Sequence, residues 1–187
     1  MLKRAFDILA SAALLVILSP LFVLCAFLVR FGSPGPIFHI SPRAGRENKI
    51  FMMPKFRSMH VGAPQVATHL IQNPKSLLTP AGRLLRRTSL DELPQLWSVL
   101  IGDMSLVGPR PALFNQHDLV AARTQLGIQA LRPGITGWAQ INGRDEISLE
   151  RKVELDHQYL QKAGFIFDLK ILLSTLWKTS QSEGVSH

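Results

Sequence analysis

"ILASAALLVILSPLFVLCAFLV", residues 8–29, contains no charged side chain over 22 consecutive positions. A straight helix of that length would extend for roughly 33 Å, which is enough to cross the hydrocarbon core of a membrane. The turn-forming sequence GSPGP follows at 32–36 in place of a small-residue cleavage site. We therefore interpret the apolar stretch as a retained membrane anchor and not as a signal peptide.

The dipeptide Ser19-Pro20 lies in the middle of this apolar stretch. Because proline lacks a backbone N–H and clashes with the preceding turn, the helix is expected to bend there. Positive charge flanks both ends, with Lys3 and Arg4 before the stretch and Arg30 after it. The tendency of basic residues to stay in the cytoplasm favours a re-entrant helix-break-helix, whose two ends lie on the same side. A kinked spanning helix is the alternative, since membrane helices tolerate proline.

The net charge of the 187-residue chain is +8, and most of the excess lies in residues 1–60, which hold eight Lys or Arg and two acids. Basic residues beside an apolar anchor favour an anionic membrane surface. Nucleic acid is not expected as a partner, because no recognition-helix pattern or aromatic-basic interleaving is present. The single cysteine, Cys25, excludes a disulfide framework and is expected to pack against lipid or a neighbouring helix.

Beyond the anchor, the sequence predicts a small β-hairpin followed by several helices. Residues 36–59 have the pattern of two short strands around a turn near Gly45. Thr79-Pro80 is a typical helix start, with threonine as the cap and proline in the first turn. Helical patterns occupy 81–88, 113–131, 147–162 and 165–178.

The predicted fold class is α+β and predominantly helical. The length suits a single functional unit, which we divide into a re-entrant membrane anchor at 1–31 and a domain at 32–187. The last apolar helix, 165–178, is too short to span a membrane. It suits either the membrane interface, as an amphipathic interfacial helix, or packing in the core.

Adjacent carboxylates, Asp91 and Glu92, stand out in TSLDELPQLW at 88–97 because the surrounding chain is basic. One structural interpretation is a capping box from Ser89 to Glu92, although Pro94 would then fall in the second turn. A helix capped by Asp91 itself would place the proline in the first turn. In either case the helix dipole favours negative charge and would keep both acids ionised. A nucleophile or a ligand of Mg²⁺ requires that state.

Basic residues in loops framed by glycine or proline accompany the acid pair. They are Arg110 in GPRP, Arg132 in RPG, Arg144 in NGR, and Lys55 with Arg57 in PKFRSM. Any one of them could instead form a surface ion pair or clamp a loop, but several together suit phosphate oxygens. The combination predicts a reaction at a phosphate group assisted by Mg²⁺. Walker A, G-x-G-x-x-G, H-E-x-x-H and C-x-x-C motifs are absent, so an ordinary nucleotide cradle or a zinc site is not expected.

Four blocks of the chain resemble the bacterial sugar transferases, also called monotopic phosphoglycosyl transferases. The blocks are KRAFDILASAALLVILSP at 3–20, KFRSM at 55–59, RRTSLDELPQLWSVLIGDMSLVGPRP at 86–111 and RPGITGWAQINGR at 132–144. They occur in the family's order and at its spacing, and the resemblance covers nearly the whole chain, which is similar to small members that consist of the catalytic domain alone. The resemblance implies transfer of a sugar phosphate from a UDP-sugar to undecaprenyl phosphate, with release of UMP, at the cytoplasmic face of the bacterial inner membrane.

The resemblance also implies a role for each matched residue. In the family, the first acid of the pair attacks the β-phosphate and forms an aspartyl-phosphosugar intermediate, which the polyprenyl phosphate then resolves. That acid is Asp91, and Glu92 would help to hold Mg²⁺ or assist proton movement. The Ser-Pro break of the family's re-entrant helix falls on Ser19 and Pro20. The family's phosphate-binding and site-supporting basic residues fall on Lys55, Arg86, Arg110 and Arg144, and a further acid falls on Asp156.

Two other functions are compatible with the same residues. A membrane-surface scaffold would use the anchor and the basic residues, with the acids acting only as a helix cap. A metal-dependent phosphohydrolase would let water, in place of a lipid phosphate, resolve the intermediate. The choice among glucose, galactose, N-acetylglucosamine and modified amino sugars stays open at the level of sequence.

Overall fold

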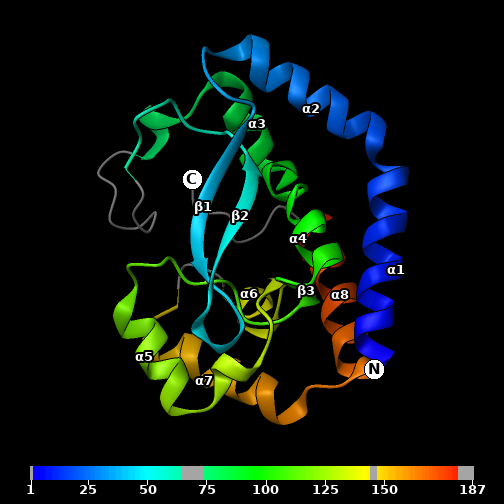
Figure 1. Ribbon diagram of the computed structural model, residues 1–187, viewed down its shortest axis with the longest axis vertical. Coiled ribbons are helices and arrows are strands. Elements are labelled where there is room, and N and C mark those ends of the chain that lie inside the picture. Colours follow the sequence, from blue (N-terminus) through cyan, green and yellow to red (C-terminus); the bar gives the residue numbers. More distant parts are fainter. Residues whose placement is uncertain (1, 65–73, 144–146, 181–187) are drawn as a thin grey trace.

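The computed structural model describes residues 2–64, 74–143 and 147–180. Figure 1 shows helices α1 and α2 as a bent arm along one side and across the top of the molecule, with α8 beside α1. The predicted predominance of helix is confirmed. The helices are α1 (Leu2–Ile17), α2 (Ser19–Gly32), α3 (Pro80–Arg87), α4 (Gln95–Ile101), α5 (His117–Gln125), α6 (Trp138–Ile141), α7 (Leu149–Lys162) and α8 (Phe165–Ser180), and the strands are β1 (Phe38–Ala44), β2 (Ile50–Phe56), β3 (Ser105–Val107) and β4 (Gly134–Thr136).

The long apolar stretch forms two helices with a 63° bend between them. Pro20 lies in the first turn of α2, where its missing N–H leaves no bond unmade. The hydroxyl of Ser19 donates to the carbonyl of Val16 at 2.8 Å, and so binds a carbonyl at the end of α1. The predicted bend at Ser19-Pro20 is therefore confirmed. Within the described residues, no single helix has the length and hydropathy to cross a membrane, whereas α1 and α2 meet those two criteria together.

Polar contacts bind the N-terminal half of α1 to the rest of the protein. The guanidinium of Arg4 donates to the carbonyls of Val99 and Leu100 at 2.6 and 2.9 Å, at the C-terminal end of α4. A helix C-terminus favours a cation there. The buried carboxylate of Asp7 accepts from the N–H of Leu106 on β3 at 3.1 Å. Arg4 is thus more than a charge flanking the anchor, since it fixes α1 against the fold.

Strands β1 and β2 form the predicted antiparallel hairpin, which crosses the middle of the molecule (Figure 1). Phe38 lies opposite Phe56, and the next pair along the ladder is His39 and Lys55. Because side chains alternate between the two faces of a strand, His39 and Lys55 share one face. That face carries the hairpin residues that belong to the candidate active site.

A second pair of strands, β3 and β4, is parallel and was missed by the sequence analysis. Ser105 lies opposite Gly134, and Val107 lies opposite Thr136. Strands of three residues are too short to show an alternating pattern. The chain segments approach so closely beyond β3 that a Cβ atom on Gly134 would lie 2.1 Å from the backbone nitrogen of Gly108. Only glycine permits this approach, which places the loop after β3 firmly against β4.

Helix α8 has two different faces. Ile171 is fully buried in the main hydrophobic cluster, together with Val99 and Met104. Ile166 and Leu173, by contrast, are 83% and 60% exposed. The core-packing interpretation of the last helix therefore holds for one face, while the other face leaves large apolar side chains uncovered.

Cys25 is 1% exposed and lies in a smaller cluster with Val29, Phe56 and Leu85. Of the two surroundings considered for this residue, the neighbouring helix is the one observed, because Leu85 belongs to α3. This cluster joins the second half of the bent arm to the hairpin and to α3.

The predicted helices at 81–88 and 147–162 are confirmed as α3 and α7. Thr79 caps α3 by accepting from the N–H of Gly82 at 2.9 Å. The prediction of one helix over 113–131 was wrong. Helix α5 ends at Gln125, and Gly127 with a φ of 74° turns the chain into a separate 3₁₀ turn at Ile128–Ala130.

Candidate active site

Asp91 and Glu92 lie in one 3₁₀ turn, Leu90–Glu92, just before α4. Both capping interpretations were wrong. Ser89 has a left-handed backbone with a φ of 56°, and its side chain makes no capping bond. This conformation turns the chain out of the geometry that a capping box needs. The cap position of α4 is occupied by Pro94, so neither acid is used as a helix cap.

Glu92 binds two cations from different parts of the chain. Its Oε1 accepts from Nζ of Lys55 on β2 at 2.7 Å and from Nη2 of Arg110 in the loop after β3 at 3.1 Å. The Lys55 and Glu92 side chains are only 16% and 18% exposed, so water screens this pair weakly. Burial raises the pKa of Glu92, but the two cations outweigh it and hold that pKa well below its usual range. Glu92 is therefore an ionised anchor for both cations.

Asp91 is buried, with 6% of its surface exposed, and forms no hydrogen bond or ion pair with the residues that the structure describes. Burial raises the pKa of Asp91 to about 6, and the neighbouring charge of Glu92 adds to this shift. Three cations, Lys55, Arg86 and Arg110, partly offset it. The expectation that helix position alone keeps this acid ionised was thus incomplete, because desolvation acts in the opposite direction. Asp91 is therefore a buried carboxyl group that has three cations nearby and no direct partner among the described residues.

Arg86 reaches the same region from α3. Its Nε donates to Oγ of Ser58 at 3.1 Å, which orients the guanidinium beside the acid turn. Its charge acts on Asp91 without a direct contact, because it lowers the pKa of that acid. The structure therefore brings Lys55, Arg86 and Arg110 together around the acid pair.

Two further basic residues of the site, His39 and Arg43, were not assigned to it by the sequence analysis. Nη1 of Arg43 donates to the carbonyl of Pro111 at 3.2 Å. Burial and the nearby charge of Arg110 lower the pKa of Arg43 to about 10. Burial and the charge of Lys55 likewise lower the pKa of His39. The strand alternation of β1 was the available signal, because it places both residues on one face with Lys55 across the ladder.

Asp156 lies away from the acid pair and acts on the site through a residue that the sequence analysis missed. Its Oδ2 accepts from Nε and Nη2 of Arg123 at 3.0 and 2.6 Å, and both side chains are buried. The remaining nitrogen, Nη1 of Arg123, donates to the backbone carbonyl of Arg110 at 2.8 Å. Asp156 therefore supports the loop that carries Arg110. Arg123 sits in a helical pattern and offers no local signal of this role.

Two other predicted cations clamp loops, which is the alternative that the sequence left open for them. Arg57 is buried and donates to three carbonyls of the 33–36 linker at 2.7–2.8 Å. Nε of Arg132 donates to the carbonyl of Gly102 at 2.9 Å. Arg144 lies outside the described residues.

The family model for bacterial sugar transferases matches residues 1–182. The chain belongs to this family. It is 44% identical to the uncharacterized sugar transferase EpsL of Bacillus subtilis, over 98% of this chain and 90% of that protein. It is 41% identical to the UDP-glucose:undecaprenyl-phosphate glucose-1-phosphate transferase of Escherichia coli, over 95% of this chain. It is 36% identical to the undecaprenyl-phosphate galactose phosphotransferase of Salmonella typhimurium, over 93% of this chain.

The chain spans 40% of the Escherichia coli relative and 39% of the Salmonella relative, so it corresponds to one part of each. The resemblance that the four sequence blocks indicated is confirmed at the level of the family. The matched region of this bacterial sugar transferase includes Asp91 and Glu92, Lys55 on the hairpin and the loop that carries Arg110.

The chemistry of the acid pair fits one particular mode of Mg²⁺ binding. Within the described residues, no three or more His, Cys, Asp or Glu side chains gather as they would in an all-protein metal site. Mg²⁺ is often held by only one or two carboxylates together with phosphate oxygens of the substrate and water. Asp91 and Glu92 are two adjacent carboxylates, the number that this mode of binding would need.

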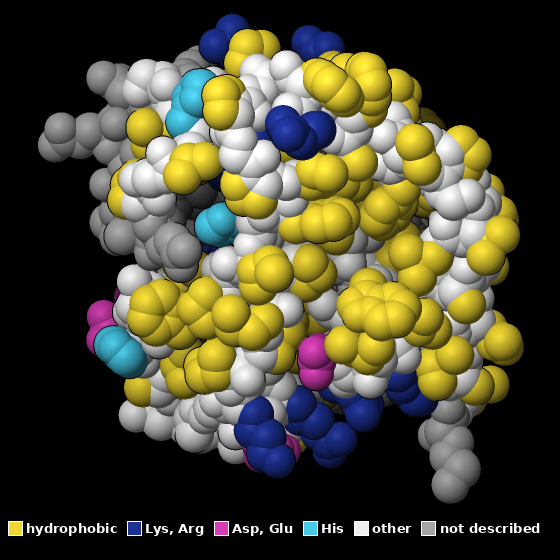
Figure 2. All heavy atoms as spheres, turned by 45° about the horizontal axis from the view of Figure 1, so that its top comes forward, with side chains coloured by type: hydrophobic (Ala, Val, Ile, Leu, Met, Phe, Trp, Pro, Cys, Tyr) yellow, Lys and Arg dark blue, Asp and Glu magenta, His cyan; other side chains and the backbone are white. Residues whose placement is uncertain are grey.

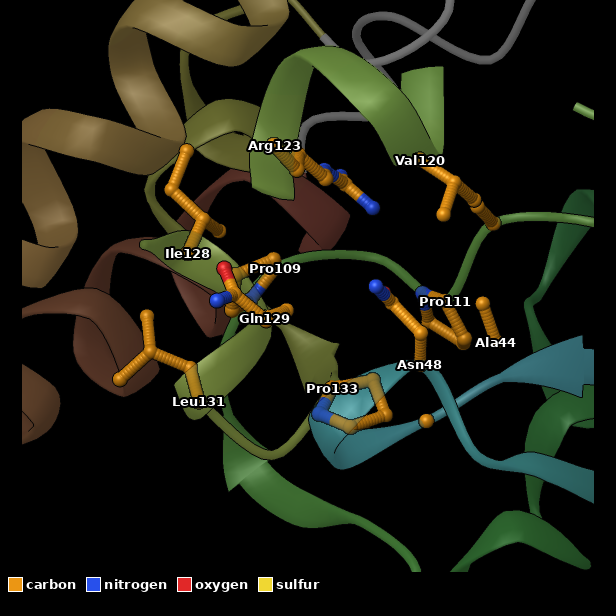
Figure 3. Close-up of a pocket in the computed structure, with 12 residues that line it drawn as sticks. Ala44, Asn48, Pro109, Pro111, Val120, Arg123, Ile128, Gln129, Leu131 and Pro133 are labelled. Carbon is orange, nitrogen blue, oxygen red and sulfur yellow. The ribbon is translucent and has the colours of Figure 1, made fainter. Parts of the chain in front are cut away.

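A hollow lies beside the loop that carries Arg110, and neither Asp91 nor Glu92 lines it. Figure 3 shows Arg123 and Asn48 on its walls, with Pro109 and Pro111 on the loop beside it. The amide Oε1 of Gln129, which also lines it, is buried without a hydrogen-bond partner in the described part of the chain. The hollow therefore borders Arg123, which supports the loop that carries Arg110.

The ion pair between Asp156 and Arg123 predicts a stability effect. Asp156→Asn is expected to lower the free energy of unfolding by about 3–5 kcal/mol, because it leaves the buried guanidinium without its charge partner. Thermal and denaturant unfolding of the purified protein in nanodiscs measure the change. The matched control is Glu154→Gln, whose partner Arg151 is half exposed, so the loss should be much smaller. Equal losses for the two variants would contradict the structural role of Asp156.

Proposed function

We propose that this protein transfers a sugar phosphate from a UDP-sugar to undecaprenyl phosphate and releases UMP. The observation that carries this proposal is the contrast between the two acids. Glu92 gathers Lys55 and Arg110, while the buried Asp91 beside it has no direct partner among the described residues. The names of the Escherichia coli and Salmonella relatives, both undecaprenyl-phosphate sugar phosphotransferases, support the same substrate classes.

In the proposed first step, a carboxylate oxygen of Asp91 attacks the β-phosphorus of the UDP-sugar. A new P–O bond to Asp91 forms while the P–O bond to UMP breaks, and UMP leaves with the electron pair. In the second step, an oxygen of undecaprenyl phosphate attacks the same phosphorus, and the carboxylate of Asp91 leaves. The product is the undecaprenyl-diphosphate-sugar, and Asp91 is regenerated. A covalent intermediate lets the soluble donor and the lipid acceptor use the site in turn.

We propose that the basic residues around Asp91 bind and neutralise phosphate oxygens. Lys55 and Arg110 are held together by Glu92, and Arg86 is held by Ser58, so their orientation does not depend on the substrate. Such preorganised charge stabilises a transition state in which negative charge spreads over phosphate oxygens. When bound at Asp91 and Glu92, Mg²⁺ would supply further neutralisation of the donor's diphosphate. Assistance of proton movement is the other role proposed for Glu92.

We further propose that residues 1–31 form a re-entrant anchor and that residues 32–187 form a catalytic domain at the cytoplasmic face of the inner membrane. Figure 2 shows hydrophobic side chains spread over much of one face, with most of its Lys and Arg toward the upper and lower edges. Contiguous exposed apolar surface of this extent is typical of a protein or membrane interface. The exposed apolar residues include Leu9, Val16 and Ile17 on α1, Val23, Phe27 and Phe31 on α2, Trp97 and Ile101 on α4, and Ile166, Leu173, Leu176 and Trp177 on α8.

The location explains why the protein needs both parts. The lipid acceptor resides in the membrane, whereas a UDP-sugar is dissolved in the cytoplasm. Anionic lipids suit the basic residues near the anchor. A site at the inner leaflet is the place where the two substrates meet.

The decisive experiment incubates the purified full chain with Mg²⁺, undecaprenyl phosphate and a panel of UDP-sugars, and measures UMP. The panel contains glucose, galactose, N-acetylglucosamine and a modified amino sugar. We expect one preferred sugar, and we expect UMP release beyond the first equivalent per protein to require the lipid phosphate. Release of UMP and sugar phosphate without the lipid would support a phosphohydrolase instead. Absence of product with every sugar would support a membrane-surface scaffold.

The environment of Asp91 predicts a pH dependence. The reactive form is the carboxylate, so kcat/KM is expected to fall about tenfold for each pH unit below about 6, the pKa of Asp91. If Asp91 had an ordinary pKa, kcat/KM would fall only near pH 4. The measurement is the initial rate of UMP release between pH 5 and 8, with thermal unfolding at each pH as the control for folding. A flat profile over that range would contradict the raised pKa.

A further inference from the structure

The carbonyl of Val107, at the end of β3, is bound by a side chain from the N-terminal helix. Nζ of Lys3 on α1 donates to this carbonyl at 3.1 Å. The same ammonium group donates to the hydroxyl of Tyr159 on α7 at 3.3 Å and to Oδ2 of Asp168 on α8. An ammonium group has three N–H donors, and each of them has an acceptor here.

We call the side chains of Lys3, Tyr159 and Asp168 the Lys3 network. Tyr159 and Asp168 also contact each other directly. The hydroxyl of Tyr159 donates to Oδ1 of Asp168 at 2.7 Å, and it lies 3.2 Å from the carbonyl of Val107. Since the phenol has one proton, the shorter bond to the carboxylate takes it. Tyr159 and Asp168 are buried, so the charges and the hydroxyl depend on one another for their hydrogen bonds.

Val107 lies only three residues before Arg110, and the segment between them has little freedom. Gly108 is pressed against β4, and the ring of Pro109 restricts the backbone. The carbonyl of Pro109 accepts from the N–H of Gly134 at 2.9 Å, and that of Arg110 accepts from Arg123. A shift of the Val107 carbonyl would therefore move the start of the loop that presents Arg110 to Glu92.

We propose that Lys3, Tyr159 and Asp168 are positioning residues that couple the seating of the N-terminal helix to the placement of Arg110. Helix α1 is part of the bent apolar arm, so the network links the membrane-associated part of the chain to the catalytic loop. The proposal rests on the proposed function for what Arg110 does. The alternative is that the network only fastens α1 to the body of the protein.

The test variant is Tyr159→Phe, which keeps the ring that packs against Phe167 and removes only the hydroxyl. The matched control is Ser11→Ala, which removes a fully buried hydroxyl from α1 outside the network. Hydrogen–deuterium exchange of residues 105–113 is the readout that does not require activity. We expect faster exchange of this segment in Tyr159→Phe and no change in Ser11→Ala.

The catalytic readout is a double-mutant cycle with Arg110→Ala. Tyr159→Phe is expected to lower kcat roughly tenfold in the wild-type background, because a misplaced binding group loses catalytic orientation. In the Arg110→Ala background the same substitution should change the rate less than about twofold, because the group that it positions is already absent. KM for the UDP-sugar and the melting temperature should change no more than in Ser11→Ala.

Equal effects of Tyr159→Phe in both backgrounds, or unchanged exchange of residues 105–113, would overturn the coupling. If Tyr159→Phe fails to fold, Asp168→Asn takes its place in both readouts, since it keeps the shape of the side chain and removes its charge. If the wild-type protein releases no UMP from any UDP-sugar, the proposed function has failed, and the exchange experiment still decides whether the network holds the loop.

Discussion

Asp91→Asn is expected to abolish turnover, lowering the rate of UMP release by at least about a thousandfold. The amide has the size of the carboxylate but is not a nucleophile for phosphorus. Because Asp91 forms no hydrogen bond or ion pair with the described residues, the substitution breaks no polar contact among them. We therefore expect the variant to fold normally, with a melting temperature equal to or slightly above that of the wild type.

The control for this variant is Asp118→Asn, which makes the same chemical change at an exposed position on α5. It should retain full activity. The two variants are compared by UMP release at saturating donor and lipid and by thermal unfolding. Substantial residual activity in Asp91→Asn, with normal folding, would remove the basis for its role as nucleophile.

Glu92→Gln is expected to lower kcat/KM by roughly a hundredfold or more, because Lys55 and Arg110 lose the anion that holds them together. If Glu92 also holds Mg²⁺, as we propose, excess Mg²⁺ should restore part of the activity. Loss of the neighbouring negative charge also lowers the pKa of Asp91. The acid limb of the pH profile should consequently move below pH 6 in this variant.

Steady-state kinetics across a range of Mg²⁺ concentrations and pH values measure these effects together. Glu154→Gln, a half-exposed glutamate on α7, is the control and should behave as the wild type. Full activity of Glu92→Gln at ordinary Mg²⁺ would show that the reaction does not need Glu92 to gather the two cations.

Features of this fold that depend on local chemistry were predictable from the sequence. Proline placed the bend between α1 and α2, and the threonine-proline pair placed the start of α3. Strand patterns around Gly45 gave the hairpin. The adjacent acids and the basic residues Lys55 and Arg110 indicated a shared site, and the structure brings these four side chains together.

Features that depend on distant contacts could not be predicted in the same way. The parallel pair β3 and β4 is set by close backbone approach at Gly108 and Gly134, which no periodicity reveals. The left-handed backbone of Ser89 prevents a capping box from forming, although the sequence matches the pattern of one. Arg123 became identifiable only once folding had placed it between Asp156 and the backbone of Arg110.

The measurement that tests the central claim most directly is mass spectrometry of the protein after incubation with the UDP-sugar and Mg²⁺ but without lipid phosphate. After rapid quenching and proteolysis, we predict the added mass of a sugar phosphate on the peptide that contains Asp91, formed together with about one equivalent of UMP. The Asp91→Asn variant should show neither. A preparation that transfers sugar phosphate to the lipid, yet shows no adduct on Asp91 at any quench time, would contradict the covalent mechanism.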